Sequence, residues 1–101
     1  MAEQDLESTL YQALTAYARD RGFRLGEEAA RHAVDNAVAN IQRRAFDDDQ
    51  RQAALQQAIG ALPQLERAIT AMTASRAFPD RNSVQALRES CKDVPYPWNC
   101  R

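Results

Sequence analysis

The sequence predicts an all-α fold: a small bundle of four to five short helices, followed by an extended C-terminal tail that one disulfide ties back to the bundle. Apolar residues recur at three- and four-residue spacing along most of the 101 residues, which is typical of amphipathic helices. No segment has the alternation and the β-branched content of a strand. The length fits one domain, with the bundle in residues 1–92 and the tail packed on it in residues 93–101.

Alanine dominates the apolar composition. Apolar residues make up 45% of the chain and nineteen of them are alanine, whereas Leu, Ile, Val and Phe together number only eighteen. So few large side chains suggest disorder, but disordered chains also carry a high net charge, and the net charge here is −1. Because the alanines fall in register on the predicted helix faces, we interpret them as surfaces for close helix packing.

The first helix is expected at about residues 4–21. Its apolar face contains Leu6, Leu10, Ala13, Leu14 and Tyr17. Acidic residues stand at its start and arginines at its end, which the helix dipole favours. Gly22 suits the position after the last turn, where helices often adopt a left-handed backbone.

The second helix is expected at about residues 27–46, opened by Gly26 and an acidic pair and closed by Arg43 and Arg44. Its apolar stripe is narrow and made mostly of small side chains: Ala30, Ala33, Val34, Ala37, Val38, Ile41 and Ala45. Such a stripe lets a neighbouring helix approach closely.

A third helical segment begins at residues 47–49, where Asp47 or Asp48 suits the N-cap. Gly60 and Pro63 should interrupt it, because proline lacks a donor and clashes with the preceding turn. The apolar register nevertheless continues to Met72. One long helix kinked at residues 60–63 and two helices joined by a tight break are both compatible with this pattern, and we favour the break.

The last helix is short and is expected to begin after Asn82, an N-cap residue with Gln85 three positions later. Its pattern stops after Cys91. In the remaining tail, Pro95 and Pro97 bias the residues before them away from helix, so we expect extended or turn conformations.

The two cysteines, Cys91 and Cys100, lie within the last eleven residues. Their spacing is not that of a Cys-x-x-Cys redox or zinc site. We predict a disulfide that pins the tail to the last helix, which implies a periplasmic or secreted protein. The alternative is two reduced thiols in a cytoplasmic protein. The first residues lack the apolar core of an export signal, so the periplasmic interpretation requires that a signal has been removed.

Tyr96 and Trp98 allow two interpretations of the tail. Both residue types are enriched at the energetic centres of protein interfaces, so they are candidate partner-binding residues. The alternative, which we favour for Trp98, is that its indole covers the open end of an alanine-rich core, since one buried tryptophan adds as much apolar area as several alanines.

Nothing in the sequence forms a catalytic, metal or cofactor site. His32 is the single histidine, with Glu28 one turn before it and Asp35 and Asn36 about one turn after it, and we interpret this group as a solvated polar face. No serine lies in a Gly-x-Ser-x-Gly turn. Residues 47–49 lack the ligand alternation of a calcium loop and fit helix capping better. We therefore expect a protein that is not an enzyme.

Charge and hydropathy narrow the possible partners. The arginines form two groups, but acidic residues are interleaved with both, so nucleic-acid binding is disfavoured. No apolar run approaches the roughly 20 residues of a membrane span. The remaining expectation is a protein-binding module that covers a protein partner, as inhibitors, toxin-immunity proteins, secretion adaptors and chaperones do, with a homodimer also possible. The alternative is a small dimeric nucleic-acid-associated regulator.

Overall fold

The computed structural model describes residues 6–22, 25–74, 84–89 and 97–99. Within these ranges the chain forms five helices and no strand, so the all-α prediction is confirmed. The helices are α1 (Leu6–Arg21), α2 (Glu27–Arg44), α3 (Asp48–Gly60), α4 (Leu62–Ala74) and α5 (Val84–Glu89). The expected N-cap Asn82, both cysteines and Tyr96 lie outside the described residues.

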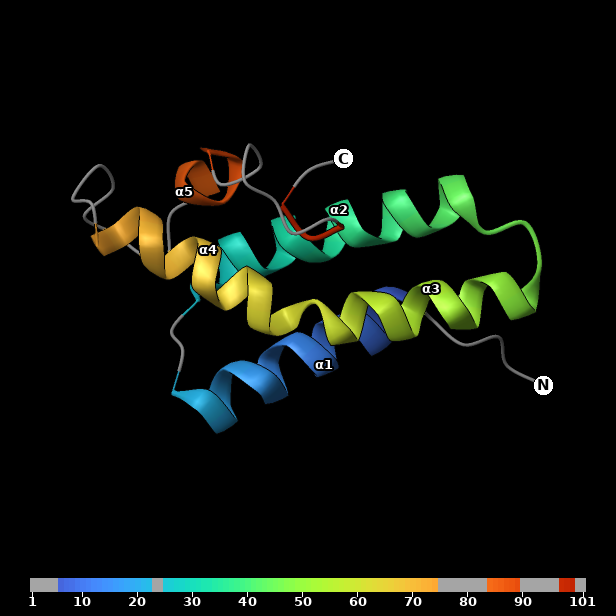
Figure 1. Ribbon diagram of the computed structural model, residues 1–101, viewed down its shortest axis with the longest axis horizontal. Coiled ribbons are helices and arrows are strands. Elements are labelled where there is room, and N and C mark those ends of the chain that lie inside the picture. The colour runs from blue at the N-terminus through green and yellow to red at the C-terminus, as the bar shows by residue number, and fades with distance from the viewer. Residues whose placement is uncertain (1–5, 23–24, 75–83, 90–96, 100–101) are drawn as a thin grey trace.

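Three rows of helix lie side by side and alternate in direction (Figure 1). The first row is α1, the second is α2, and the third is α3 followed end to end by α4. The short helix α5 packs on α2 and α4. Because α2 also contacts α1 and α3, it is the central element of the bundle.

Local sequence rules account for the end of α1 and the start of α3. Gly22 has a left-handed backbone with φ of 68°, and its N–H bonds to the carbonyl of Arg19, as expected for the residue after a helix. Asp47 is the N-cap of α3 and its carboxylate accepts from the Gln50 N–H at 2.8 Å. The Gln50 side chain reaches back to accept from the Phe46 N–H at 2.7 Å, which fixes the turn before α3.

The interruption at residues 60–63 takes the form of two helices separated by Ala61 alone. Ala61 keeps a right-handed backbone, with φ −88° and ψ −3°, and its N–H bonds back to the carbonyls of Gln57 and Ala58. Pro63 is the second residue of α4, where a missing N–H leaves no hydrogen bond unmade. The break at Ala61 therefore places Pro63 in the first turn of a new helix, where proline is tolerated.

The predicted end of α2 at residue 46 is wrong. The helix stops at Arg44, and Ala45 is extended, with φ −104° and ψ 116°. The chain must reverse before Asp47, whose own extended backbone caps α3. The two residues that were assigned to the helix therefore form the turn, and Phe46 projects from it.

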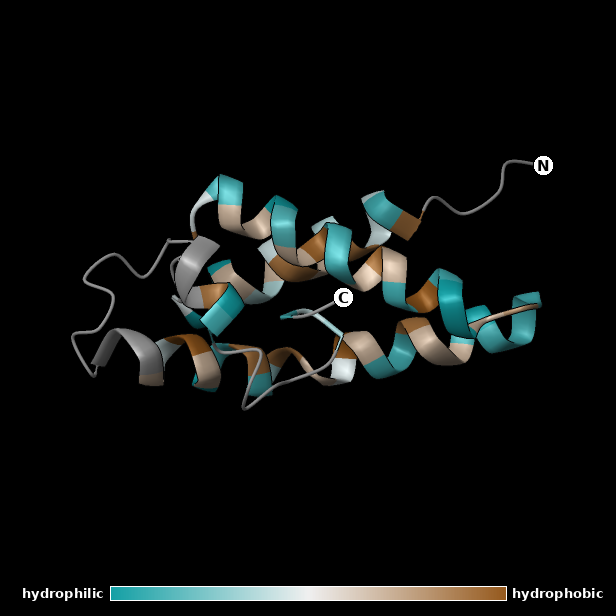
Figure 2. Cartoon of the chain, turned by 90° about the horizontal axis from the view of Figure 1, so that it is seen from above, coloured by the Kyte–Doolittle hydropathy of each residue, from teal (hydrophilic) through white to brown (hydrophobic). Residues whose placement is uncertain are grey.

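The core lies along the line where the three rows meet, and Figure 2 shows hydrophobic residues recurring on the helices that surround it. On α2 it is built mostly of alanines, with Val34 and Ile41, whereas leucines and an isoleucine from α1, α3, α4 and α5 face them. The buried apolar residues are Leu10, Leu14, Ala29, Ala30, Ala33, Val34, Ala37, Ile41, Ala45, Leu55, Ala58, Ala61, Leu62, Leu65, Ile69, Leu87 and Trp98. The small side chains of α2 let its neighbours approach closely on several sides.

Candidate functional site

The C-terminal residues Pro97, Trp98 and Asn99, named here the clasp, are buried against the helices. The side chain of Trp98 is 0% exposed, and its Nε1–H donates to the carbonyl of Ala58 at 2.7 Å. Ala58 lies in the last turn of α3, and its carbonyl also accepts from the Ala61 N–H at 3.1 Å. The indole therefore fills the core and gives this carbonyl a second donor.

Two asparagines of α2 hold the main chain of the clasp. Asn36 and Asn40 are only 4% and 1% exposed. Their Nδ2 groups donate to the carbonyls of Trp98 at 3.0 Å and Pro97 at 2.9 Å. Because the two asparagines are four positions apart, they lie one turn apart on one helix face and meet successive carbonyls of the turn at residues 97–99.

The interpretation of Asn36 as part of a solvated polar face is wrong. Asn36 points into the core, while the neighbouring Asp35 is exposed and His32 is half-buried. Asn40 was not singled out at all. Both asparagines are in register with the buried alanines of α2, so the sequence contained a signal: two amides spaced by four on an otherwise apolar face.

Trp98 and Tyr96 were the candidate partner-binding residues. The clasp holds the indole of Trp98 inside the core, so it offers no surface to a partner in this conformation. Tyr96 lies outside the described residues. Cys91 and Cys100 do as well, so their disulfide stays a prediction.

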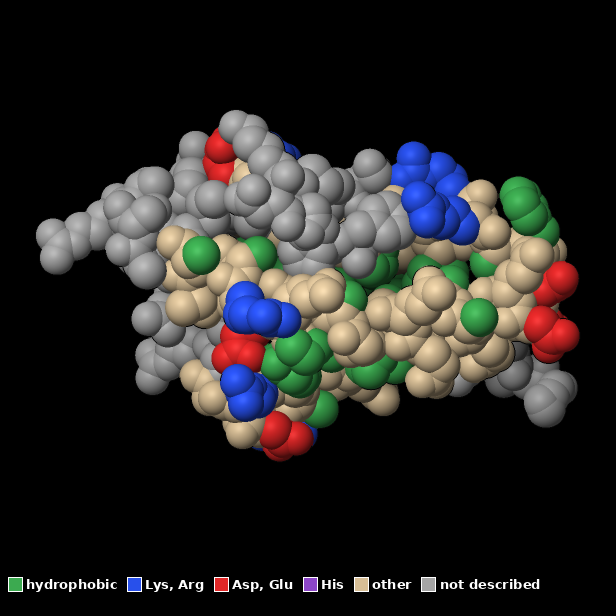
Figure 3. Space-filling view, in the orientation of Figure 1, with side chains coloured by type: hydrophobic (Ala, Val, Ile, Leu, Met, Phe, Trp, Pro, Cys, Tyr) green, Lys and Arg blue, Asp and Glu red, His purple; other side chains and the backbone are tan. Residues whose placement is uncertain are grey.

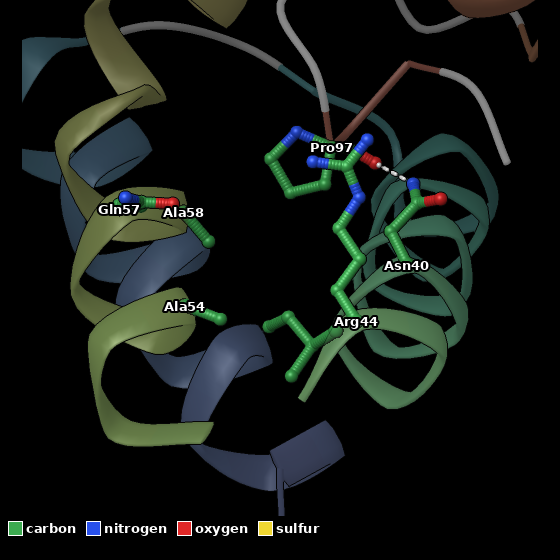
Figure 4. A pocket seen from close by; sticks show the side chains of 7 residues that line it. Asn40, Arg44, Ala54, Gln57, Ala58 and Pro97 are labelled. Atoms are coloured by element: carbon green, nitrogen blue, oxygen red, sulfur yellow. Dashed lines mark hydrogen bonds between the residues drawn. The ribbon is translucent and has the colours of Figure 1, made fainter. Parts of the chain in front are cut away.

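A pocket opens between α2 and α3 beside the clasp (Figure 4). Asn40, Ile41 and Arg44 form the α2 wall, and Ala54, Gln57 and Ala58 form the α3 wall. Pro97 closes one end, where its carbonyl accepts the hydrogen bond from Asn40. The space is about 350 Å³, part of it open solvent. Its walls are mostly apolar, and Arg44 is the charged residue among the lining side chains.

Phe46 is the large apolar side chain that the described part of the chain leaves in solvent, with 83% of its surface exposed. It stands at the α2–α3 turn, directly before the carboxylates of residues 47–49. The hydrogen bond from its own N–H to Gln50 and the cap formed by Asp47 fix the backbone on which it stands. Phe46 was expected at the end of a helix, and its exposure was not predicted.

A polar group joins α1 to α4 on another side of the bundle. The carboxylate of Glu66 accepts from the Tyr17 hydroxyl at 2.7 Å and from Arg21 Nε at 3.1 Å. Burial raises the pKa of Tyr17 above 10.0, and the hydrogen bond to Glu66 adds to this effect. The same bond lowers the pKa of Glu66 below 4.5, against the opposing effect of burial, and Arg21 lowers it further. We interpret the group as a cross-link between helices.

The other charged candidates form local contacts along the helices. Arg31 pairs with Glu27 at 3.0 Å and Arg51 pairs with Asp48 at 2.9 Å. Across the described ranges, no three His, Cys, Asp or Glu side chains are placed to share a metal ion. No helix in those ranges has the length and apolar character needed to cross a membrane.

Comparisons of the chain with models of known protein families, with curated proteins and with solved structures give no match.

Proposed function

We propose that the protein is a non-enzymatic binding module that covers a protein partner, and that the contact lies at the α2–α3 end of the bundle. The observation that carries this proposal is the exposure of Phe46. A large aromatic side chain that is 83% exposed leaves apolar area in water that a partner would cover. Aromatic residues of this kind are enriched at the centres of protein interfaces.

The setting of Phe46 supports a binding role. Its backbone is held by Gln50 and by the Asp47 cap, so little backbone freedom would be lost on binding. The pocket between α2 and α3 has mostly apolar walls, and Gln57 supplies an exposed amide at its edge. This composition suits recognition better than proton transfer, which needs paired titratable groups.

The kind of partner follows from the class of protein. Small helical inhibitors, toxin-immunity proteins, secretion adaptors and chaperones all act by occupying a surface of another protein. We place this protein in that class and, if Cys91 and Cys100 are bonded, in the bacterial envelope.

Mass measurement of freshly isolated native protein, alkylated with and without reductant, tests the compartment. Two free thiols would contradict an envelope location.

A crosslinking experiment tests the binding role. A photoreactive amino acid at Asp49, an exposed position three residues after Phe46, is used to capture partners in extracts of the native organism, and captured proteins are identified by mass spectrometry and purified. Binding of a purified partner is then measured by calorimetry for the wild-type chain, for Phe46→Ala and for the control Gln56→Ala, at an exposed position of α3.

We expect Phe46→Ala to weaken binding at least tenfold, a loss of roughly 1.4 kcal/mol or more, and Gln56→Ala to leave binding unchanged. A purified partner that binds Phe46→Ala as tightly as wild type would refute the assignment of the contact to this end of the bundle.

A further inference from the structure

We infer that the clasp is a redox-sensitive closure, which stays shut when Cys91 and Cys100 are bonded and opens more often when they are reduced. This device lies at the C-terminal end of the chain and requires no partner at the α2–α3 end. Three observations carry it. The clasp contacts α5, the two cysteines follow the two sides of that contact in the sequence, and the clasp itself belongs to no helix.

A buried hydrogen bond joins the clasp to α5. The side chain of Asn99 donates from Nδ2 to the carbonyl of Leu87 at 3.4 Å. Both residues are almost fully buried, so water does not compete for this contact. Leu87 lies in the last turn of α5, and α5 itself packs on α2 and α4. The clasp is therefore attached to the last helix as well as to α2 and α3.

The two cysteines follow the two sides of this contact in the sequence. Cys100 comes directly after Asn99. Cys91 comes four residues after Leu87, and four residues of chain span at most roughly 14 Å. The length of the chain therefore permits the two sulfurs to meet beside the contact between the clasp and α5. A bond between them closes a short loop that holds the clasp against this helix.

The contacts of the clasp break without breaking a helix. Asn36 and Asn40 hold its carbonyls and the Trp98 indole bonds to α3, and these bonds join residues 40 to 62 positions apart. The segment can therefore leave the bundle for a small fraction of the time while the described helices stay formed. Opening exposes the core surface beneath the indole, next to the hollow between α2 and α3 in which Figure 3 shows hydrophobic side chains.

The disulfide acts on the open state of the clasp. When the clasp opens with the sulfurs bonded, the chain between them remains a closed loop, whereas the reduced chain gains conformational freedom. For a loop of about ten residues, this gain raises the population of the open state by up to about 100-fold in the chain-entropy model. In the reduction step, a dithiol supplies two electrons and two protons to the Cys91–Cys100 bond and becomes a disulfide itself, which leaves two thiols on the protein.

Hydrogen exchange of the Trp98 indole N–H, followed by NMR, measures the opening of the clasp. The sequence contains a single tryptophan, so one indole signal reports it. The full-length chain is oxidised in a glutathione redox buffer, its bond is verified by mass after alkylation, and exchange is measured before and after reduction with dithiothreitol. We expect reduction to accelerate indole exchange at least tenfold. The backbone amides of Leu10 and Leu14, buried in α1, report global unfolding, and the indole should exchange faster than both in either redox state.

A double variant, Cys91→Ser with Cys100→Ser, is the matched control. Its indole should exchange at the rate of the reduced wild type, both with and without dithiothreitol. Because the main comparison uses one wild-type chain in two redox states, it does not depend on whether the variant folds. Circular dichroism shows that the helices persist after reduction.

Three results would overturn the inference. Two free thiols after incubation with oxidised glutathione would mean that no bond exists to control the clasp. An indole exchange rate that reduction leaves unchanged would separate the bond from the clasp. An indole rate equal to that of the α1 amides would mean that the clasp opens only when the whole domain unfolds. Indole exchange that is faster than the α1 amides and accelerates on reduction supports the inference, and none of these results bears on binding through Phe46.

Discussion

Replacing Trp98 by alanine removes the largest of the fully buried side chains and opens the clasp. Truncation of a buried tryptophan costs about 3–5 kcal/mol through lost apolar burial and the cavity that remains. The hydrogen bond from Nε1 to the Ala58 carbonyl contributes about 1 kcal/mol more. We therefore expect Trp98→Ala to lower the free energy of unfolding by about 4–6 kcal/mol, a large part of the roughly 5–15 kcal/mol of a typical domain.

Urea denaturation followed by far-ultraviolet circular dichroism measures this loss, because the variant has no tryptophan left to report by fluorescence. Phe46→Ala is the matched control: it truncates an aromatic side chain that is 83% exposed, so the change should stay within about 0.5 kcal/mol. Thermal unfolding should show the same contrast, at about 4–8 °C for each kcal/mol in a domain of this size. A loss below about 2 kcal/mol for Trp98→Ala would refute the interpretation of the clasp as part of the core.

Three further predictions address other parts of the structure. Asn36→Ala and Asn40→Ala each leave a buried carbonyl of the clasp without its donor, and urea denaturation should show a loss of about 1–3 kcal/mol for each. Folding lowers the pKa of Glu66, so its carboxylate adds stability above pH 4.5 that is lost as the pH falls through the folded value; in an acid titration of stability, Tyr17→Phe should lose less than wild type over this range. Gly60→Ala should raise the melting temperature, equivalent to about 0.5–1 kcal/mol, because Gly60 lies in a helix without a positive φ and an added Cβ meets no atom within 4 Å; an unchanged or lower melting temperature would contradict this.

The helices could be predicted because their signals are local. Gly22 needs only its own freedom to adopt a positive φ, and Asp47 caps α3 with a contact three residues away. The break near Pro63 follows from the covalent structure of proline. Each of these features is determined within about one helical turn, so the sequence around it is sufficient evidence.

The end of α2 could not be predicted in the same way. The apolar pattern and helix propensity continue through Ala45, and the N-cap at Asp47 requires only that the helix end before residue 47. The helix stops at Arg44 because the chain must reverse to place α3 against α2, a requirement that arises from tertiary packing. The exposure of Phe46 follows from this reversal, so the candidate site was missed for the same reason.

The contacts of the clasp are a second case of non-local structure. In the sequence, Asn36 and Asn40 look like ordinary polar residues. Their carbonyl partners lie some sixty positions later, so nothing near them reveals the contact. What the sequence does contain is their register with buried alanines, and a buried amide requires a hydrogen-bond partner. The two amides therefore predict that some segment of the chain packs on this face of α2, but they do not identify that segment.

The separation of these partners along the chain has a kinetic consequence. The three hydrogen bonds that hold Pro97 and Trp98 join residues 40, 57 and 62 positions apart. Contacts that close such long loops form late, after neighbouring helices have paired. Interactions that are absent from the folding transition state slow unfolding and leave the folding rate nearly unchanged. In stopped-flow fluorescence of the single tryptophan, Asn36→Ala should therefore accelerate unfolding and barely alter refolding, so that the clasp sets how long the folded protein persists.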